Sequence, residues 1–148
     1  MPAMRHWLLS ALLQAGWAPA GVFLFHAFAS RVLRLYEYQP ASDIAMHSLG
    51  GIAIAFFFWR AASLAAGAGV IGAINRTGLS VMVFGLTCAA AVFWEFGEYL
   101  SDRYLGTRTQ LGLDDTLGDM LVGIVGGVAF LAATRALSTA RRGRSPGG

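Results

Sequence analysis

Four long apolar runs restrict what this chain can fold into more than any other feature. They cover residues 7–32, 43–62, 78–100 and 115–137, and few charges interrupt them. A helix that crosses a bilayer needs about 20 largely apolar residues, and a helix satisfies its own backbone polar groups in lipid. The pattern predicts an all-α fold, a polytopic transmembrane helix bundle of about four spanning helices. We expect one domain over residues 1–140 and a disordered basic tail over residues 141–148.

The composition agrees with a membrane protein and argues against two other classes of protein. Charged residues make up 13% of the chain, against about 25% in soluble domains. All 11 basic residues are arginines that separate the apolar runs. They form no patch mixed with exposed aromatic residues, so we expect no nucleic-acid partner. With Cys88 as its one cysteine, the chain can build neither a disulfide framework nor a zinc–thiolate cluster.

The first apolar run has the outline of a secretory signal peptide. Arg5 precedes the apolar residues, and Ala18-Pro19-Ala20 has the shape of a cleavage site. The apolar sequence resumes directly afterwards. We therefore expect a retained first helix that is kinked at Pro19.

The arginines predict an orientation in the membrane, because cytoplasmic loops carry an excess of basic residues. Seven lie near the N-terminus, the second loop or the C-terminus, and four lie near the first and third loops. The seven are Arg5, Arg60, Arg76, Arg135, Arg141, Arg142 and Arg144, and the four are Arg31, Arg34, Arg103 and Arg108. We therefore expect both termini to be cytoplasmic and the first and third loops to lie outside.

The acidic residues are distributed still more unevenly than the arginines. All eight lie in the first or third loop or in the helix ends beside them: Glu37, Asp43, Glu95, Glu98, Asp102, Asp114, Asp115 and Asp119. Consecutive spanning helices run antiparallel, so the starts of the second and fourth helices meet the end of the third. The sequence therefore predicts that three helices bring ionisable groups to one membrane face.

Six residues near this face have spacings that group them on single helix faces: Asp43, His47, Glu95, Glu98, Asp115 and Asp119. Residues three or four apart are neighbours on a helix surface. Gly51, Gly123 and Gly127 continue the same faces, and such spacing of small residues is typical of close contacts between transmembrane helices. We expect the six residues to form one cluster and the three glycines to lie at helix contacts.

Several interpretations of these acids remain open. Asp114 begins a helix, where an acid caps free N–H groups. Glu95 and Glu98 stand at a helix C-terminus, where the dipole disfavours acids, so they need a cation, and Arg103 or Arg108 could form a structural ion pair. A divalent metal ion bound by the six residues is another candidate, because carboxylates with one imidazole suit zinc, manganese, iron or magnesium. Closely packed carboxylates could also hold protons.

Three short motifs resemble a known family. They are Asp43-x-x-x-His47, Glu95-Phe-Gly-Glu98, and the segment from Gly106 to Met120 with its Gln, Asp-Thr and Asp-Met pattern before a glycine-rich helix. Their order and spacing resemble the YjdF-like inner-membrane proteins and, more distantly, the VanZ-like proteins, which are linked to glycopeptide-antibiotic tolerance. The resemblance implies a multi-pass protein of the bacterial inner membrane.

Three functions fit the sequence, which does not decide whether the chain is an enzyme. The first is a metal-dependent hydrolase of a lipid or lipid-linked substrate at the outer leaflet, with Glu98 or Asp119 as general base. The second is a non-catalytic subunit of a membrane complex or a homo-oligomer. The third is a proton- or ion-coupled transporter, which is disfavoured because no inverted repeat is visible. An enzyme should leave the cluster open to a cavity, whereas a subunit should close it with Arg103 or Arg108.

Overall fold

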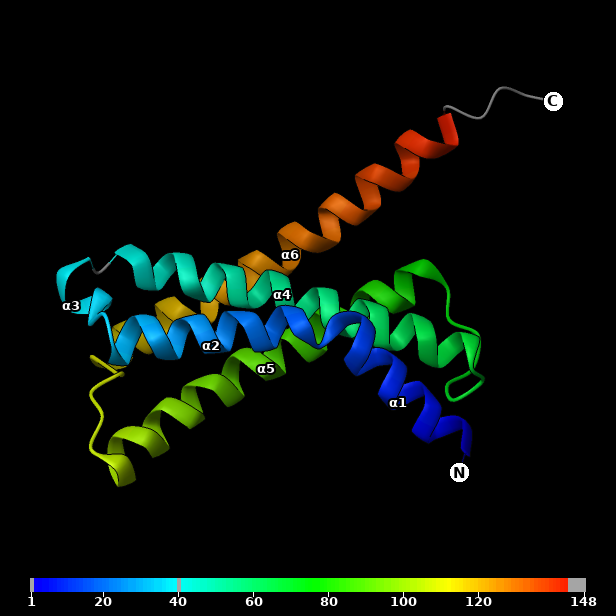
Figure 1. The fold of residues 1–148 in the computed structure, drawn as a ribbon. Helices are drawn as coiled ribbons and strands as arrows, with labels where there is room; N and C mark the ends of the chain where they lie inside the picture. Colours follow the sequence, from blue (N-terminus) through cyan, green and yellow to red (C-terminus); the bar gives the residue numbers. More distant parts are fainter. Residues whose placement is uncertain (1, 40, 144–148) are drawn as a thin grey trace.

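Helices make up all the regular structure in the described part of the chain. A computed structural model describes residues 2–39 and 41–143. The helices are α1 (Pro2–Ala15), α2 (Trp17–Arg31), α3 (Leu35–Tyr38), α4 (Ala41–Gly67), α5 (Arg76–Leu105) and α6 (Leu113–Gly143). These residues include no strand (Figure 1), and the predicted all-α fold is therefore confirmed.

Three helices are long and apolar enough to cross a membrane. They are α4, α5 and the part of α6 from Leu113 to Ala140. The helices α1 and α2 meet the same criterion only as a bent pair, which gives up to four spans if the pair crosses once. The described residues thus contain three to four candidate spans, in agreement with the predicted number.

The predicted kink in the first apolar run lies one turn before Pro19. The two helices meet at Gly16 and differ in direction by 54°. Pro19 has no N–H to donate to the carbonyl of Ala15, and its ring would collide with that carbonyl in a straight helix. The break at Gly16 removes the collision. Pro19 then falls in the first turn of α2, where N–H groups have no partner within the helix anyway.

The helices extend beyond the apolar runs that predicted them. The helix α4 ends at Gly67 rather than at residue 62, and α5 covers residues 76–105 rather than 78–100. Hydropathy reports the hydrocarbon part of a span, whereas backbone hydrogen bonding continues into the polar interface. The helix α6 continues through Gly143, so residues 141–143 of the expected disordered tail are helical. Arg141 and Arg142 favour this extension, because arginine is a good helix former. Residues 144–148 of that tail lie outside the described residues.

The helices α4 and α6 approach each other closely through glycines. A Cβ atom added to Gly51 of α4 would lie 1.8 Å from the carbonyl oxygen of Gly123 in α6. A Cβ atom added to Gly126 would lie 2.2 Å from the carbonyl oxygen of Ser48. Gly123 itself leaves more room, because its added Cβ atom would lie 3.6 Å from the carbonyl oxygen of His47. Gly51 and Gly123 therefore lie at a helix contact as expected. Gly126 lies there as well, although it is not on the face predicted from the spacing.

The helix α5 packs against this pair through other small or medium-sized residues. A Cβ atom added to Gly127 would lie 2.7 Å from Cγ2 of Thr87. Val83 of α5 and Ala55 of α4 are fully buried. These small side chains let the three long helices approach one another, as is typical of transmembrane bundles.

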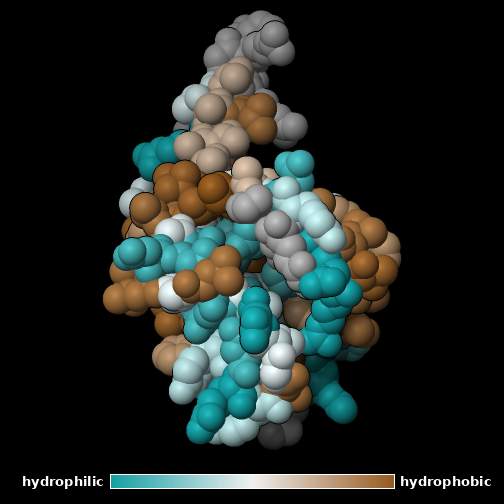
Figure 2. Space-filling model, turned by 90° about the vertical axis from the view of Figure 1, so that its left-hand side faces the viewer, coloured by the Kyte–Doolittle hydropathy of each residue, from teal (hydrophilic) through white to brown (hydrophobic). Residues whose placement is uncertain are grey.

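One end of the bundle carries the acidic residues. It consists of α3, the first turns of α4 and α6, the last turns of α5 and the loop 106–112, and we call it the polar end. It lies at the left of Figure 1, whereas the loop 68–75 and the start of α1 lie at the other end. Figure 2 looks onto the polar end and shows hydrophilic residues at its centre and hydrophobic residues on its flanks. The charge pattern of the sequence predicted this asymmetry.

Candidate functional site

Three of the six predicted site residues converge at the polar end. Asp43 and His47 lie one turn apart on α4, and Asp119 lies inside the first turns of α6. Nε2 of His47 is 3.5 Å from Oδ1 of Asp43 and 3.7 Å from Oδ2 of Asp119. The three potential ligand atoms all lie within 4.8 Å of one another. The glycine contact between α4 and α6 places Asp119 beside His47, since Gly123 and Gly51 each lie one turn deeper on the same helices.

The separations between His47 and the two carboxylates are longer than those of strong direct hydrogen bonds. An N–H···O hydrogen bond is about 2.9 Å long, which is shorter than the 3.5 and 3.7 Å seen here. Two ligand atoms that lie about 2.1 Å from one tetrahedral ion are about 3.4 Å apart. Carboxylates and an imidazole are suitable ligands for zinc, manganese or iron. The arrangement can therefore accommodate one divalent ion after a small shift of side chains.

Glu95 lies beside this group on α5 and is 5% exposed. Its Oε1 atom has no hydrogen-bond partner among the described residues. Nε2 of Gln110 donates to the backbone oxygen of Glu95 at 3.1 Å and lies 3.4 Å from Oε2. A buried polar atom without a partner is costly. A cation or a hydrogen-bond donor that reached Oε1 would therefore be bound favourably.

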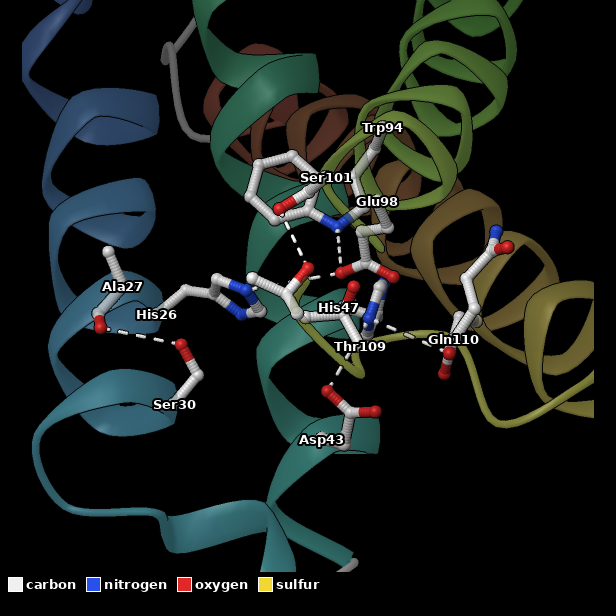
Figure 3. Close-up of polar contacts among 12 residues, drawn as sticks. His26, Ala27, Ser30, Asp43, His47, Trp94, Glu98, Ser101, Thr109 and Gln110 are labelled. Atoms are coloured by element: carbon white, nitrogen blue, oxygen red, sulfur yellow. Dashed lines mark hydrogen bonds and ion pairs between the residues drawn. The ribbon is translucent and has the colours of Figure 1, made fainter. Parts of the chain in front are cut away.

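Glu98, one turn further along α5, contacts α2. Its Oε1 accepts a hydrogen bond of 2.9 Å from Nε1 of Trp94 and lies 3.9 Å from Nε2 of His26 (Figure 3). The ring of Trp94 is perpendicular to the rings of His26 and His47, with centroids 5.1 and 6.4 Å away. Glu98 thus contacts Trp94 and α2, whereas Glu95 contacts Gln110 of the loop 106–112.

His26 was not among the predicted site residues. It comes from α2, which Figure 3 shows beside α4, with the imidazole pointing toward Glu98 of α5. One signal in the sequence could have identified it, because an ionisable residue within an apolar membrane segment marks a functional position by default.

Asp115 and Asp114 do not belong to the converging group. Oδ2 of Asp115 accepts a hydrogen bond of 3.0 Å from the backbone N–H of Leu111, so Asp115 ties the loop 106–112 to the start of α6. Asp114 is exposed in the first turn of α6. An acid at this position interacts favourably with the helix dipole, which agrees with the structural role expected for Asp114.

Asp102 orders the loop 106–112. Its carboxylate accepts hydrogen bonds from the backbone N–H groups of Thr109 and Gln110, each at 2.9 Å, and from the hydroxyl of Thr109 at 2.8 Å. The hydroxyl of Thr107 lies 2.5 Å from Oδ1. The loop conformation that results carries the side chain of Gln110 to Glu95. From the sequence, Asp102 is expected only as one of the acids at this face.

The structure gives no support to an arginine ion pair at the cluster. Among the residues whose side chains are described, the ion pairs of Asp43, Glu98 and Asp119 all involve a histidine. Arg103 and Arg108 are exposed, and within that same set no ion pair joins either of them to Glu95 or Glu98. The described arginines therefore do not close the cluster.

A cavity of about 220 Å³ extends from the cluster into the bundle. Its ionisable lining residues are His26, His47, Glu95 and Asp119, and most of its other lining residues are apolar or glycine. An apolar cavity with a few convergent polar groups is the usual form of a small-molecule site. The cluster is therefore open to a ligand.

Comparison with known proteins gives a family and one relative. Residues 4–140 match a family described as "Predicted membrane protein (DUF2238)". A protein of Thermotoga maritima, described as "Uncharacterized protein", is 31% identical over 113 residues, which are 72% of this chain and 54% of that protein. The chain thus spans about half the length of this relative. No solved structure matches the chain.

Proposed function

We propose that this chain, which belongs to the DUF2238 family of predicted membrane proteins, binds a divalent metal ion through Asp43, His47 and Asp119. The observation that carries the proposal is the convergence of two carboxylates and one imidazole within 4.8 Å. They come from two helices that glycine contacts hold together. Three protein ligands leave a position on the ion for water or substrate, as in catalytic zinc sites.

The reaction we propose for this site is hydrolysis of a lipid or lipid-linked substrate. A bound divalent ion makes water a nucleophile near neutral pH. The sequence suggested Asp119 or Glu98 as the general base. Asp119 is one of the three proposed metal ligands, and Oε1 of Glu98 already accepts a hydrogen bond from Trp94. Glu95 lines the cavity, and its Oε1 is unpaired among the described residues. Glu95 therefore suits the role of general base better than either.

The open cavity favours this proposal over a non-catalytic subunit. A subunit that uses its acids only for packing should neutralise them with arginine, and no such pair occurs among the described side chains. A transporter is the weakest alternative, because three or four candidate spans offer little room for alternating access.

The setting we propose is a bacterial inner membrane with the polar end on the outer side. A family of predicted membrane proteins and a bacterial relative support a bacterial membrane, and the resemblance to YjdF-like proteins agrees with the inner membrane. The arginine distribution supports the orientation. The distant resemblance to VanZ-like proteins stays a prediction.

Cysteine accessibility tests this orientation. In a Cys88→Ala background, Arg108→Cys lies in the loop 106–112 and Thr139→Cys lies near the end of α6, and both positions are exposed. In spheroplasts, an impermeant maleimide should label Arg108→Cys directly and Thr139→Cys only after the membrane is opened. Labelling of both from the same side would contradict the bundle topology, and the reverse pattern would contradict the orientation.

Metal content tests the proposed site. Protein purified in detergent and loaded with zinc or manganese should retain about one ion per chain. His47→Ala and Asp119→Asn should each weaken metal binding by about 100-fold or more, because the loss of an outer-shell partner alone costs 10- to 100-fold. Asp114→Asn makes the same carboxylate-to-amide change as Asp119→Asn at an exposed position of α6, and it should bind metal like the parent. A parent protein without stoichiometric metal, or with a melting temperature that chelators leave unchanged, would refute the proposal.

A further inference from the structure

The lining of the cavity changes from polar at the polar end to apolar deeper in the bundle, on each of α2, α4 and α5. On α4 the lining runs from His47 at the polar end to Ile54, about two turns deeper. On α2, which runs the opposite way, it extends from His26 to Pro19 over a similar distance. At 1.5 Å per residue, the cavity reaches about 10 Å into the bundle.

The wall on α5 follows the same order. Glu95 lies near the polar end and Thr87 lies about two turns deeper. The hydroxyl of Thr87 donates to the carbonyl oxygen of Val83 at 2.8 Å, so this group is satisfied within its own helix. The deep end therefore offers a ligand apolar surface, and the shallow end offers ionisable groups.

The wall between α2 and α5 is closed by side chains alone. The helix α2 packs on α4, whereas among the described residues no Cα atom of α2 lies within 8 Å of one in α5. The rings of Phe23 and Trp94 span this gap edge to face, with centroids 5.8 Å apart. Phe23 is 54% exposed on the outer surface of the bundle, which a bilayer would surround. His26 of α2 also spans this gap, 3.9 Å from Glu98 of α5. Rotation of these side chains, without movement of a helix, would open the cavity sideways to lipid.

From this geometry we infer that the cavity binds one hydrocarbon chain of a membrane amphiphile, which enters between α2 and α5 with its anionic head at Asp43, His47 and Asp119. The contact with the head rests on the proposed function, since carboxylates without a metal ion would repel an anion. The contact with the hydrocarbon chain does not depend on the proposed function. Water is a poor occupant of the deep end, because apolar cavities stay dry, whereas the bilayer supplies hydrocarbon chains at high concentration. This inference defines the substrate class of the site as an acyl or prenyl chain with an anionic head.

Photolabelling in vesicles tests the inference. The protein is reconstituted in phosphatidylcholine vesicles that contain increasing amounts of a fatty acid with a diazirine near the end of its chain. Residues deep in the cavity, such as Ile54 and Thr87, should be labelled saturably, and excess unlabelled fatty acid or prenyl phosphate should compete. Lipid-facing Phe93, which is 72% exposed, should be labelled in proportion to probe and without competition. Labelling that is proportional at every position, or absent from the cavity, would overturn the inference.

A matched pair of glycine substitutions tests the location. A Cβ atom added to Gly50 meets only Val22, at 4.0 Å, and one added to Gly85 meets nothing within 4 Å. Gly50 lines the cavity, so Gly50→Leu should fill it and lower saturable labelling at least fivefold, whereas Gly85→Leu should leave that labelling unchanged. Equal labelling of the two variants would overturn the inference. Because the saturation experiment uses the parent protein, its outcome stands even if Gly50→Leu fails to fold.

Chelation separates this inference from the proposed metal site. If both are correct, removal of the metal should raise the amount of fatty acid needed for half-saturation while cavity labelling remains saturable. If the protein binds no metal but saturable labelling of the cavity persists, the proposed function fails and the binding site for the hydrocarbon chain is supported. If metal binds but the cavity residues are never labelled saturably, the binding site for the hydrocarbon chain is refuted and the metal site is supported.

Discussion

One methyl group added at Gly51 or at Gly126 is expected to force α4 and α6 apart. The added Cβ atoms would lie 1.8 and 2.2 Å from backbone carbonyl oxygens of the facing helix. Backbone atoms cannot rotate away as side chains can, so the helices themselves must separate. Overpacking of a tight core costs about 3 kcal/mol, which corresponds to a fall in melting temperature of roughly 6–12 °C for a chain of this size. Thermal unfolding of Gly51→Ala and Gly126→Ala in detergent measures this effect.

Two further glycines of the same chain are the matched controls. A Cβ atom added to Gly123 would lie 3.6 Å from the nearest atom, and one added to Gly85 would meet nothing within 4 Å. Alanine at either position should leave the melting temperature unchanged or raise it slightly, because alanine favours helix over glycine. If all four variants melt together, the close approach of α4 and α6 is wrong.

The same glycine contact links the fold to the candidate site. His47 and Asp119 lie one turn from Gly51 and Gly123, so separation of α4 from α6 should also part the two side chains. Gly51→Ala is therefore expected to weaken metal binding without changing any proposed ligand. Gly85→Ala should have no such effect.

Much of the fold and part of the site could be predicted from the sequence. Apolar run length predicted the spanning helices, because lipid requires backbone groups to be satisfied within each segment. The i,i+4 spacing placed Asp43 and His47 on one face, and they lie 3.5 Å apart. In such cases one helix determines the geometry, so local sequence is sufficient.

Contacts that depend on two or more elements were not predicted. His26 lies 3.9 Å from Glu98, a contact that depends on how α2 packs beside α5 and not on spacing along α2. Gly126 contacts Ser48 through a helix crossing that spacing along α6 alone does not define. Asp115 bonds to the loop rather than to the cluster, because the path of a loop depends on many weak hydrogen bonds and not on periodicity.

Loss of the Asp102 carboxylate is expected to release the loop 106–112 and, with it, Gln110. Asp102 accepts hydrogen bonds from two backbone N–H groups and from the hydroxyl of Thr109, and it contacts the hydroxyl of Thr107. Hydrogen bonds to a charged group contribute about 1.5–3 kcal/mol each when buried, and partial exposure reduces this. Asp102→Ala should therefore destabilise the loop by roughly 2–4 kcal/mol.

Amide hydrogen exchange measures this release directly. Asp102→Ala should speed exchange at the amides of Thr109 and Gln110 by about 30-fold or more, the factor that corresponds to 2 kcal/mol. Exchange in the middle of α4 and α6 should stay slow, because the glycine contact does not involve the loop. Asp114→Asn, an acidic substitution at an exposed position beside the same loop, is the control and should leave both amides protected. Unchanged exchange at Thr109 and Gln110 in Asp102→Ala would show that the loop is held by other contacts, and Gln110 would then reach Glu95 independently of Asp102.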